Sequence, residues 1–193
     1  MNNTIIIYSL LSFLILFLCG KVSYKLNLLD HPNKRKIHSK ATAYTGGFAI
    51  SVILLFSIFL FTVSDKNLNI ILSIAFLISI IGLIDDKYNL DVSSKLSLQI
   101  IPIFYLVVFE NLTLQQIGDY NYFKVELGSF VIPFTLMCVL LLINAFNYFD
   151  GIDGTLGFTS ISVLIILYFL IPNQNFQLFL ILILIPLAIF LCF

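Results

Sequence analysis

Apolar residues dominate this chain in long runs, and short polar segments separate the runs. A helix of about 20 apolar residues is long enough to cross the hydrocarbon core of a bilayer. No polar stretch is long enough to form a separate soluble domain, so residues 1–193 are predicted to form one integral-membrane, all-α helical bundle. The expected spanning helices are residues 3–20, 47–64, 67–84, 96–110, 129–146, 156–172 and 176–193.

The longest polar connection on the expected outer side of the membrane comprises residues 111–128. Within it, apolar and polar side chains alternate in YFKVEL, residues 122–127. Alternation with a period of two is typical of a half-exposed strand. The sequence therefore predicts a short external hairpin in this connection.

Composition supports a membrane protein. Hydrophobic residues make up 60% of the chain and charged residues 10%, whereas soluble domains carry about 25% charged residues. The mean hydropathy is +1.07. Ten basic residues balance ten acidic ones, so the net charge indicates no nucleic-acid partner, and none is expected.

The distribution of charge predicts the orientation in the membrane. Eight of the ten Lys and Arg residues fall in two segments, 21–45 and 85–95, and cytoplasmic loops hold an excess of such residues. The first apolar run lacks a basic region before it, which argues against a cleaved signal peptide. We expect a multi-pass protein of the inner (cytoplasmic) membrane with its amino terminus outside. The same alternation places residues 146–154 on the cytoplasmic side.

Two adjacent carboxylates, Asp85 and Asp86, directly follow the third predicted helix in GLIDDKYNLD. A solvated helix end is the ordinary explanation for one aspartate at such a position. Two like charges this close disfavour joint ionisation unless a cation or a positive side chain lies between them. Mg²⁺ suits such a site because it binds carboxylate oxygens and leaves room for substrate phosphates.

A second polar motif, NAFNYFDGIDGTLG, covers residues 144–157 between two apolar runs. Its polar side chains recur every three residues, so on a straight helix they step round by about 60° each. Because Gly151 and Gly154 permit unusual backbone shapes, we expect the helix to end near Asp150 and to gather these side chains into a pocket. For Asn144, a hydrogen bond to a neighbouring helix is the ordinary alternative.

A third polar block, DHPNKRKIHSKATAYTGG, covers residues 30–47. A basic run here is compatible with a simple anchor on anionic lipid. The alternative is a clamp in which the basic side chains neutralise a diphosphate while Gly46 and Gly47 allow close approach. Together with the two acidic motifs, the run suggests a site that handles phosphate with a metal ion.

Taken together, these three segments resemble the polyprenyl-phosphate N-acetylhexosamine-1-phosphate transferase family. They follow one another in the same order as in the family, and the resemblance extends over nearly the whole chain. The second motif matches the family pattern N-x-x-N-x-x-D-G-x-D-G. RKIH and NAFNYFDGIDG are more similar to the GlcNAc-1-phosphate branch. Thr155 stands where the family usually has Leu, and KATAYTGG lacks the usual proline before the glycines. Neither difference removes a charged or amide group.

The resemblance implies transfer of a sugar-1-phosphate, most simply GlcNAc-1-phosphate, from a UDP-sugar to polyprenyl (undecaprenyl) phosphate. UMP is released, and the product serves cell-wall or surface polysaccharide synthesis, including lipopolysaccharide. Family members also carry later cytoplasmic loops, one with an F-M-G-D-type aspartate, that this sequence does not contain. The chain is therefore expected to correspond to the amino-terminal part of such an enzyme, with activity on its own left open.

The resemblance also implies catalytic and metal-binding roles. Asp85 or Asp86 is expected to act as a general base toward the lipid phosphate, and a covalent aspartyl intermediate is the alternative. Asn147 and Asp150 are expected to bind Mg²⁺, for which Mn²⁺ is an alternative, while Asp153 orients a phosphate or a metal-bound water. The predicted catalytic residues are Asp85, Asp86, Asp150 and Asp153.

Substrate binding is assigned to the basic run and to the first asparagine of the second motif. The predicted substrate-binding residues are Lys34, Arg35, Lys36, His38 and Asn144. The expected partners are a polyprenyl phosphate lipid, a UDP-N-acetylhexosamine and the membrane itself, and a homodimer is left open.

Three other classes of protein remain as alternatives. A membrane prenyltransferase also uses two aspartate motifs to bind magnesium diphosphate, but it favours a wider D-x-x-x-D spacing. CDP-alcohol phosphotransferases carry an Ala-Arg pair that is absent after the first D-G here. A transporter would place its acidic residues near the middle of the spans, whereas these lie at the predicted cytoplasmic ends.

Overall fold

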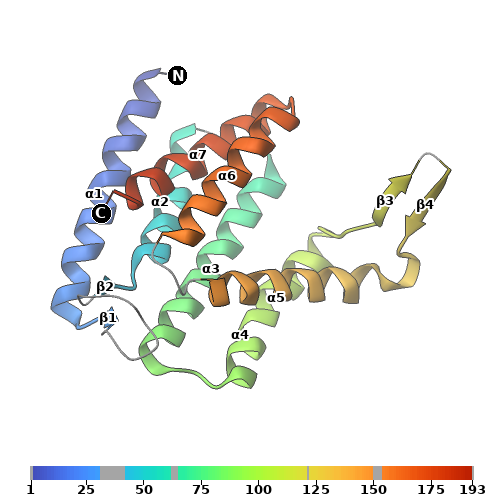
Figure 1. The fold of residues 1–193 in the computed structure, drawn as a ribbon, viewed down its shortest axis with the longest axis horizontal. Coiled ribbons are helices and arrows are strands. Elements are labelled where there is room, and N and C mark those ends of the chain that lie inside the picture. The colour runs from blue at the N-terminus through green and yellow to red at the C-terminus, as the bar shows by residue number, and fades with distance from the viewer. Residues whose placement is uncertain (1, 31–41, 62–64, 121, 150–153, 193) are drawn as a thin grey trace.

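A computed structural model describes residues 2–30, 42–61, 65–120, 122–149 and 154–192. Within these residues the chain folds into seven α-helices with two short antiparallel strand pairs (Figure 1). The helices are α1 (Asn2–Leu26), α2 (Gly46–Phe61), α3 (Lys66–Tyr88), α4 (Val92–Phe104), α5 (Val131–Phe149), α6 (Thr155–Leu170) and α7 (Gln174–Phe190). Each predicted apolar run overlaps one of them, so the all-α prediction is confirmed.

Four helical segments in the described part of the chain are long and apolar enough to cross a membrane. They are Asn3–Leu26, Lys66–Tyr88, Val92–Phe109 and Gly128–Asn147. The helices α2, α6 and α7 are equally apolar but have 16 or 17 residues. At 1.5 Å per residue such a helix is about 25 Å long, slightly short of a hydrocarbon core of about 30 Å. The chain is an integral membrane protein built as a helical bundle.

The best-packed part of the bundle joins the two ends of the chain. Helix α7 returns to lie beside α1 and α2 (Figure 1). Tyr8 of α1 is fully buried there, and its hydroxyl donates a hydrogen bond of 2.8 Å to the carbonyl of Leu182 in α7. Around this contact, Leu16, Ala49 and Ile53 complete a buried apolar cluster.

Helix α5 extends away from this cluster toward a two-stranded hairpin (Figure 1). The hairpin strands are β3 (Gln116–Tyr120) and β4 (Phe123–Glu126), paired antiparallel. A single 3₁₀ turn, η2 (Gly128–Phe130), connects the hairpin to α5. The predicted hairpin in residues 111–128 is therefore confirmed, while its external position remains a prediction.

The turn between α3 and α4 is determined by two polar residues. Asn89 adopts a left-handed conformation with φ +49°, and its N–H donates to the Asp85 carbonyl at 2.7 Å, which ends α3. Two residues later, the Asp91 carboxylate accepts a hydrogen bond from the Ser94 N–H at 3.2 Å and caps the start of α4. The prediction that α3 ends at Ile84 was wrong, because hydropathy falls there but the stop signal is Asn89. Asp85 and Asp86 thus belong to the last turns of the helix.

Ion pairs join α3 to the α4 region at both ends. One connects Asp85 to Lys95, and the other connects Lys66 to Glu110, just after the π-helical segment η1 (Tyr105–Phe109) that continues α4. Residues 66 and 85 are 19 positions apart, so the two pairs are separated by about 28 Å along α3. This separation matches the thickness of a hydrocarbon core of about 30 Å. The apolar length of α3 therefore lies between two charged ends.

Candidate functional site

The first predicted site residue, Asp85, lies against α4 in a well-protected ion pair. The Lys95 ammonium is 2.6 Å from an Asp85 carboxylate oxygen, and the two side chains are 15% and 17% exposed, respectively. A charge removed this far from water requires a partner of opposite sign. The positive partner that the adjacent aspartates require is thus present for Asp85, in the form of a lysine one turn into the next helix.

Asp86 faces a different direction. Consecutive residues of an α-helix are rotated by 100° from one another, so Asp86 cannot face α4 as Asp85 does. Its side chain is exposed at the end of α3. The two carboxylates therefore differ in exposure: Asp85 is partly buried against Lys95, whereas Asp86 is exposed.

A second contact connects α4 to α5. The side-chain amide of Asn144 donates hydrogen bonds to Gln99 Oε1 at 3.1 Å and to the Leu140 carbonyl at 2.8 Å. Gln99 is buried, with 3% of its surface exposed. The ordinary alternative for Asn144, a hydrogen bond between helices, is confirmed, and its role in substrate binding stays a prediction.

Helix α4 brings these two contacts together. Lys95 and Gln99 are four residues apart, which places them on the same face of α4 with a rise of about 6 Å between them. Through them, Asp85 of α3 and Asn144 of α5 lie beside neighbouring turns of one helix. Two polar motifs separated by about 60 positions in the sequence therefore meet at one end of α4.

The rest of the second motif is described in part. Asn147 is exposed in the last turns of α5, which extends to Phe149. Gly154 has φ +76°, a conformation that favours glycine, and α6 begins directly after it at Thr155. The predicted helix end near residue 150 is confirmed. Asp150 and Asp153 themselves lie outside the described residues, so their convergence on Asn147 stays a prediction.

The basic run also lies outside the described residues, from Lys34 through Arg35 and Lys36 to His38. Its two flanks are described, since β1 (Leu29–Asp30) and β2 (Thr42–Ala43) pair antiparallel. This pair lies at the same end of the bundle as the turn between α3 and α4 (Figure 1). The segment that contains the basic run thus starts and finishes at the end of the bundle that carries Asp85.

The two glycines that follow this segment differ in their surroundings. A Cβ atom at Gly46 would overlap the ring of Phe190 in α7, whereas a Cβ atom at Gly47 would meet nothing within 4 Å. Close approach at Gly46 therefore serves packing of α2 against α7. The expected approach of a phosphate to these glycines stays a prediction.

Three polar residues near this site were missed by the sequence reasoning. Lys95 was counted as a cytoplasmic charge, and Gln99 was passed over although it is an amide inside an apolar run. Asp91 accepts hydrogen bonds from Ser93 and Ser94, which lower the pKa of its carboxyl group to about 2. Polar residues at three- or four-residue spacing at the start of an apolar helix were the signal for all three.

Within the described residues, no three His, Cys, Asp or Glu side chains are grouped so that they could hold a metal ion. Of the two predicted ligands, Asn147 and Asp150, the structure describes Asn147, in the last turns of α5. Its amide offers an oxygen atom, which suits Mg²⁺. The chemistry of this donor fits the predicted ion, and Asp150 lies outside the described residues.

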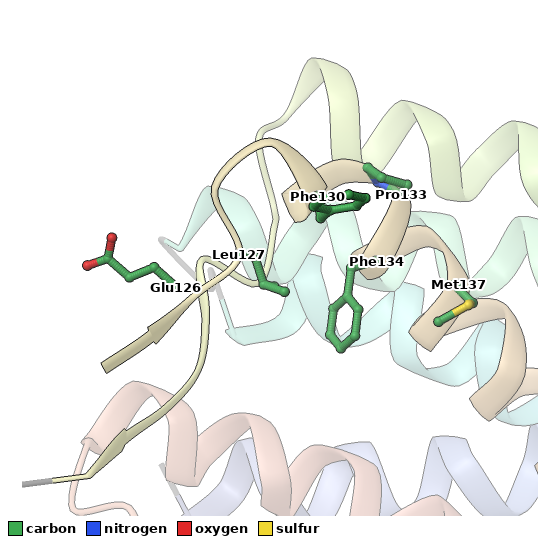
Figure 2. A pocket seen from close by; sticks show the side chains of 6 residues that line it. All are labelled: Glu126, Leu127, Phe130, Pro133, Phe134 and Met137. Carbon is green, nitrogen blue, oxygen red and sulfur yellow. The ribbon is translucent and has the colours of Figure 1, made fainter. Parts of the chain in front are cut away.

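A separate recess lies at the base of the hairpin (Figure 2). Its volume is about 380 Å³, and its lining includes Leu127, Phe130, Phe134 and Met137. Glu126 is at its edge, and Figure 2 shows the Glu126 carboxylate directed away from the aromatic side chains. None of the predicted site residues that the structure describes lines this recess.

Comparison with known proteins agrees with the polar motifs. A family model described as glycosyl transferase family 4 matches residues 68–193. The undecaprenyl-phosphate alpha-N-acetylglucosaminyl 1-phosphate transferase of Escherichia coli O157:H7 is 33% identical over 145 residues, which is 75% of this chain and 40% of the relative. The protein of the same name from Yersinia pestis is 30% identical over 158 residues, covering 81% of this chain and 43% of the relative.

A relative of the same name from Salmonella typhi is 32% identical over 146 residues, or 74% of this chain and 39% of the relative. The chain thus spans about 40% of the length of these curated relatives. No solved structure matches it. Since the family model covers well over half of the chain and agrees with the motifs around Asp85 and Asn144, this protein belongs to glycosyl transferase family 4.

Proposed function

We propose that this protein takes part in transferring a sugar-1-phosphate from a UDP-N-acetylhexosamine to polyprenyl phosphate at the cytoplasmic face of the inner membrane. The observation that carries the proposal is the meeting of Asp85 and Asn144 beside neighbouring turns of α4. The names of the matching relatives support GlcNAc-1-phosphate as the transferred group and undecaprenyl phosphate as the acceptor.

The reaction brings together two anions. An oxygen of the lipid phosphate attacks the β-phosphorus of the UDP-sugar, the bond between that phosphorus and the bridging oxygen breaks, and UMP leaves. Repulsion between the phosphates is the main obstacle, so catalysis depends on positive charge and alignment. Because the Lys95 ammonium is already paired with Asp85, the positive charge is proposed to come from the basic run of residues 34–38.

Asp86 is the proposed general base because its carboxylate is exposed at the end of α3. In this role it accepts the proton of a monoprotonated lipid phosphate and leaves the attacking oxygen with full charge. Asn144, fixed by Gln99, keeps the last turns of α5 in register with this carboxylate. The basic run from Lys34 to His38 is proposed to hold the diphosphate of the UDP-sugar.

Mg²⁺ is the proposed cofactor, held by Asn147 and Asp150, and Mn²⁺ is an acceptable substitute. When bound, such an ion offsets the negative charge of the phosphate oxygens. Asp153 is proposed to orient a phosphate. Each of these residues supplies oxygen atoms, which is the ligand type that Mg²⁺ prefers.

The direct test uses the chain reconstituted in vesicles with polyprenyl phosphate, Mg²⁺ and radiolabelled UDP-GlcNAc. Because the chain spans about 40% of its relatives, parallel vesicles also receive the carboxy-terminal part of the Escherichia coli relative as a separate polypeptide. Labelled lipid together with UMP supports the transferase. Pyrophosphate release in a parallel assay with added polyprenyl diphosphate indicates a prenyltransferase, and uptake of label without chemistry indicates a transporter.

The matched variants for this test are Asp86→Asn and Asp119→Asn. Asp119 is a half-exposed carboxylate of the hairpin, paired with Lys124 at 3.0 Å and remote from α4. We expect Asp86→Asn to abolish UMP release and Asp119→Asn to leave it unchanged. Normal turnover by the Asp86→Asn variant refutes the assignment of the base.

A further inference from the structure

The hairpin of β3 and β4 has two chemically different faces. On one face, the rings of Tyr120 and Phe123 stack with their centroids 5.1 Å apart. On the other face, the Lys124 ammonium lies 3.0 Å from the Asp119 carboxylate. Because successive side chains of a strand point to opposite faces, the hairpin is amphipathic, with an aromatic face and a charged face.

The aromatic face continues from the two rings toward the base of the hairpin. Val125 follows Phe123 at the next position on this face, and its partner in β3 is Gly118. A Cβ atom at Gly118 would lie 2.7 Å from the Tyr120 ring. The Tyr120 ring therefore lies back over the strand and extends the apolar cover of this face.

The aromatic face then leads into the recess at the base of the hairpin. The Leu127 N–H donates to the Gln115 carbonyl at 3.0 Å, so strand pairing extends to Leu127, and the alternation places its side chain on the aromatic face. Figure 2 shows Leu127 on the same side as Phe130 and Phe134, whereas the Glu126 carboxylate is directed away. One apolar surface thus extends from the hairpin onto the first turns of α5.

This surface is continuous with a helix suited to span the membrane. The apolar segment Gly128–Asn147 begins directly after Leu127. Within it, Met137 of the recess is exposed, as are Leu141 and Leu142 further along α5. In a spanning helix such side chains face lipid. No polar residue of the recess lining separates this lipid-facing surface from the aromatic face, since Glu126 points away from it.

The two faces require different solvents. Tyr120, Phe123 and Phe130 are 53%, 61% and 71% exposed, respectively, and a two-stranded hairpin is at best marginally stable in water by itself. Hydrocarbon is unsuitable as well, because this sheet has two strands and therefore two open edges, and the pair of Asp119 and Lys124 would be buried. The interface between lipid and water suits both faces, and aromatic side chains are enriched there.

We infer that the hairpin lies along the lipid–water interface, with its aromatic face among the phospholipid headgroups and upper acyl chains and its charged face toward water. The charged face carries Asp119, Lys124 and Glu126 and has no net positive charge, so this attachment needs no anionic lipid. Interfacial anchors help to determine the tilt of a spanning helix. The hairpin thereby holds the depth and tilt of α5, whose other end carries Asn147. The inference is independent of the proposed function.

The test uses the absence of tryptophan from the sequence, which makes any introduced tryptophan a single reporter. Phe123→Trp and Tyr120→Trp place the reporter on the aromatic face, and Lys124→Trp is the matched control on the charged face. The full chain is reconstituted in phosphatidylcholine vesicles. Tryptophan emission is quenched either by phosphatidylcholine brominated near the headgroup end of one acyl chain or by iodide on both sides of the membrane. Circular dichroism equal to that of the unmodified chain checks folding.

We expect brominated lipid to quench the reporters at positions 120 and 123 and to have little effect at position 124. Apolar faces of interfacial elements are buried about 5–10 Å into the headgroup boundary, so the iodide quenching constants at positions 120 and 123 should be at least about twofold smaller than at position 124. Replacement of part of the phosphatidylcholine by phosphatidylglycerol should leave all three reporters unchanged.

Three other results overturn the inference. Equal iodide quenching on both faces, without quenching by brominated lipid, shows that the hairpin stands in water. Quenching of position 124 by brominated lipid as strongly as position 123 shows that the hairpin has no preferred face toward the membrane. Shielding of positions 120 and 123 from both quenchers shows that protein covers the aromatic face, and that protein is a second copy if dilution of the chain in lipid removes the shielding.

Discussion

The Lys95 ammonium lies 2.6 Å from the Asp85 carboxylate and thereby joins the first turn of α4 to the last turns of α3. Four residues further along α4, Gln99 accepts a hydrogen bond from Asn144 of α5. Helix α4 thus aligns the acidic end of one membrane helix with the polar end of another. The site depends on this alignment, because neither helix carries the whole set of polar groups.

Loss of Lys95 should be costly for stability. Lys95→Met leaves the Asp85 carboxylate largely buried without its cation, so we expect the free energy of unfolding in detergent to fall by about 1–3 kcal/mol. The exposed pair of Lys124 and Asp119 is the control, and Lys124→Met should cost less than about 1 kcal/mol. Addition of Asp85→Leu to Lys95→Met should restore much of the loss. Equal losses of stability in the two lysine variants would show that the Asp85–Lys95 pair is not protected from water.

The hydrogen bond between Gln99 and Asn144 should contribute less. Bonds between membrane helices average about 0.6 kcal/mol and reach about 1.7 kcal/mol, so Gln99→Leu should lower the free energy of unfolding by an amount in that range. A double-mutant cycle of Gln99→Leu and Asn144→Leu measures the coupling directly. A coupling energy of zero would mean that the two side chains do not interact in the membrane.

The cap of α4 predicts a pH dependence. Hydrogen bonds from Ser93 and Ser94 hold the pKa of Asp91 at about 2, below the ordinary value of about 3.9. A lowered pKa means that the folded state favours the carboxylate, so its contribution is complete above about pH 4 and is lost as the pH falls toward about 2. The protection of the Ser94 amide from exchange, relative to its intrinsic exchange rate, should fall in this window. Asp91→Asn keeps a capping side chain but should abolish the pH dependence of that protection.

The neighbouring glycines Gly46 and Gly47 offer a matched pair of substitutions. Gly46→Ala places a methyl group against the Phe190 ring and should destabilise the packing of α2 on α7 by about 1–3 kcal/mol. Gly47→Ala meets open space and should be neutral or slightly stabilising, since alanine favours helix. Thermal unfolding of both variants checks the difference. If Gly47→Ala were the more destabilising variant, Phe190 would not lie against Gly46.

Much of the fold followed from hydropathy alone. Long apolar runs specify helices because a bilayer leaves no other partner for backbone polar groups, and the alternation in residues 122–127 identified the hairpin. The contacts between helices were less accessible. A helix that is apolar on all sides has no face that reveals its neighbours, so the rotation that turns Asp85 toward Lys95 could not be deduced from spacing.

The site was predicted only in outline. Asp85 and Asn144 were identified because polar residues are dense in the sequence around them, and both lie beside α4. Lys95 and Gln99 escaped attention because each looked ordinary by itself, the one as a cytoplasmic charge and the other as a single amide in an apolar run. Their significance comes from the partner helices that meet them.

The most direct test of the shared site is the distance between residues 86 and 150 in the membrane. Spin labels attached to cysteines in the double variant Asp86→Cys and Asp150→Cys, in a background free of other cysteines, measure it by pulsed electron resonance in vesicles. If both side chains border one phosphate site, the distance between the spin labels should not exceed the combined length of the two label side chains, and both cysteines should react with a thiol reagent from the cytoplasmic side. A separation of tens of ångströms, or reaction from opposite sides of the membrane, would contradict a shared site.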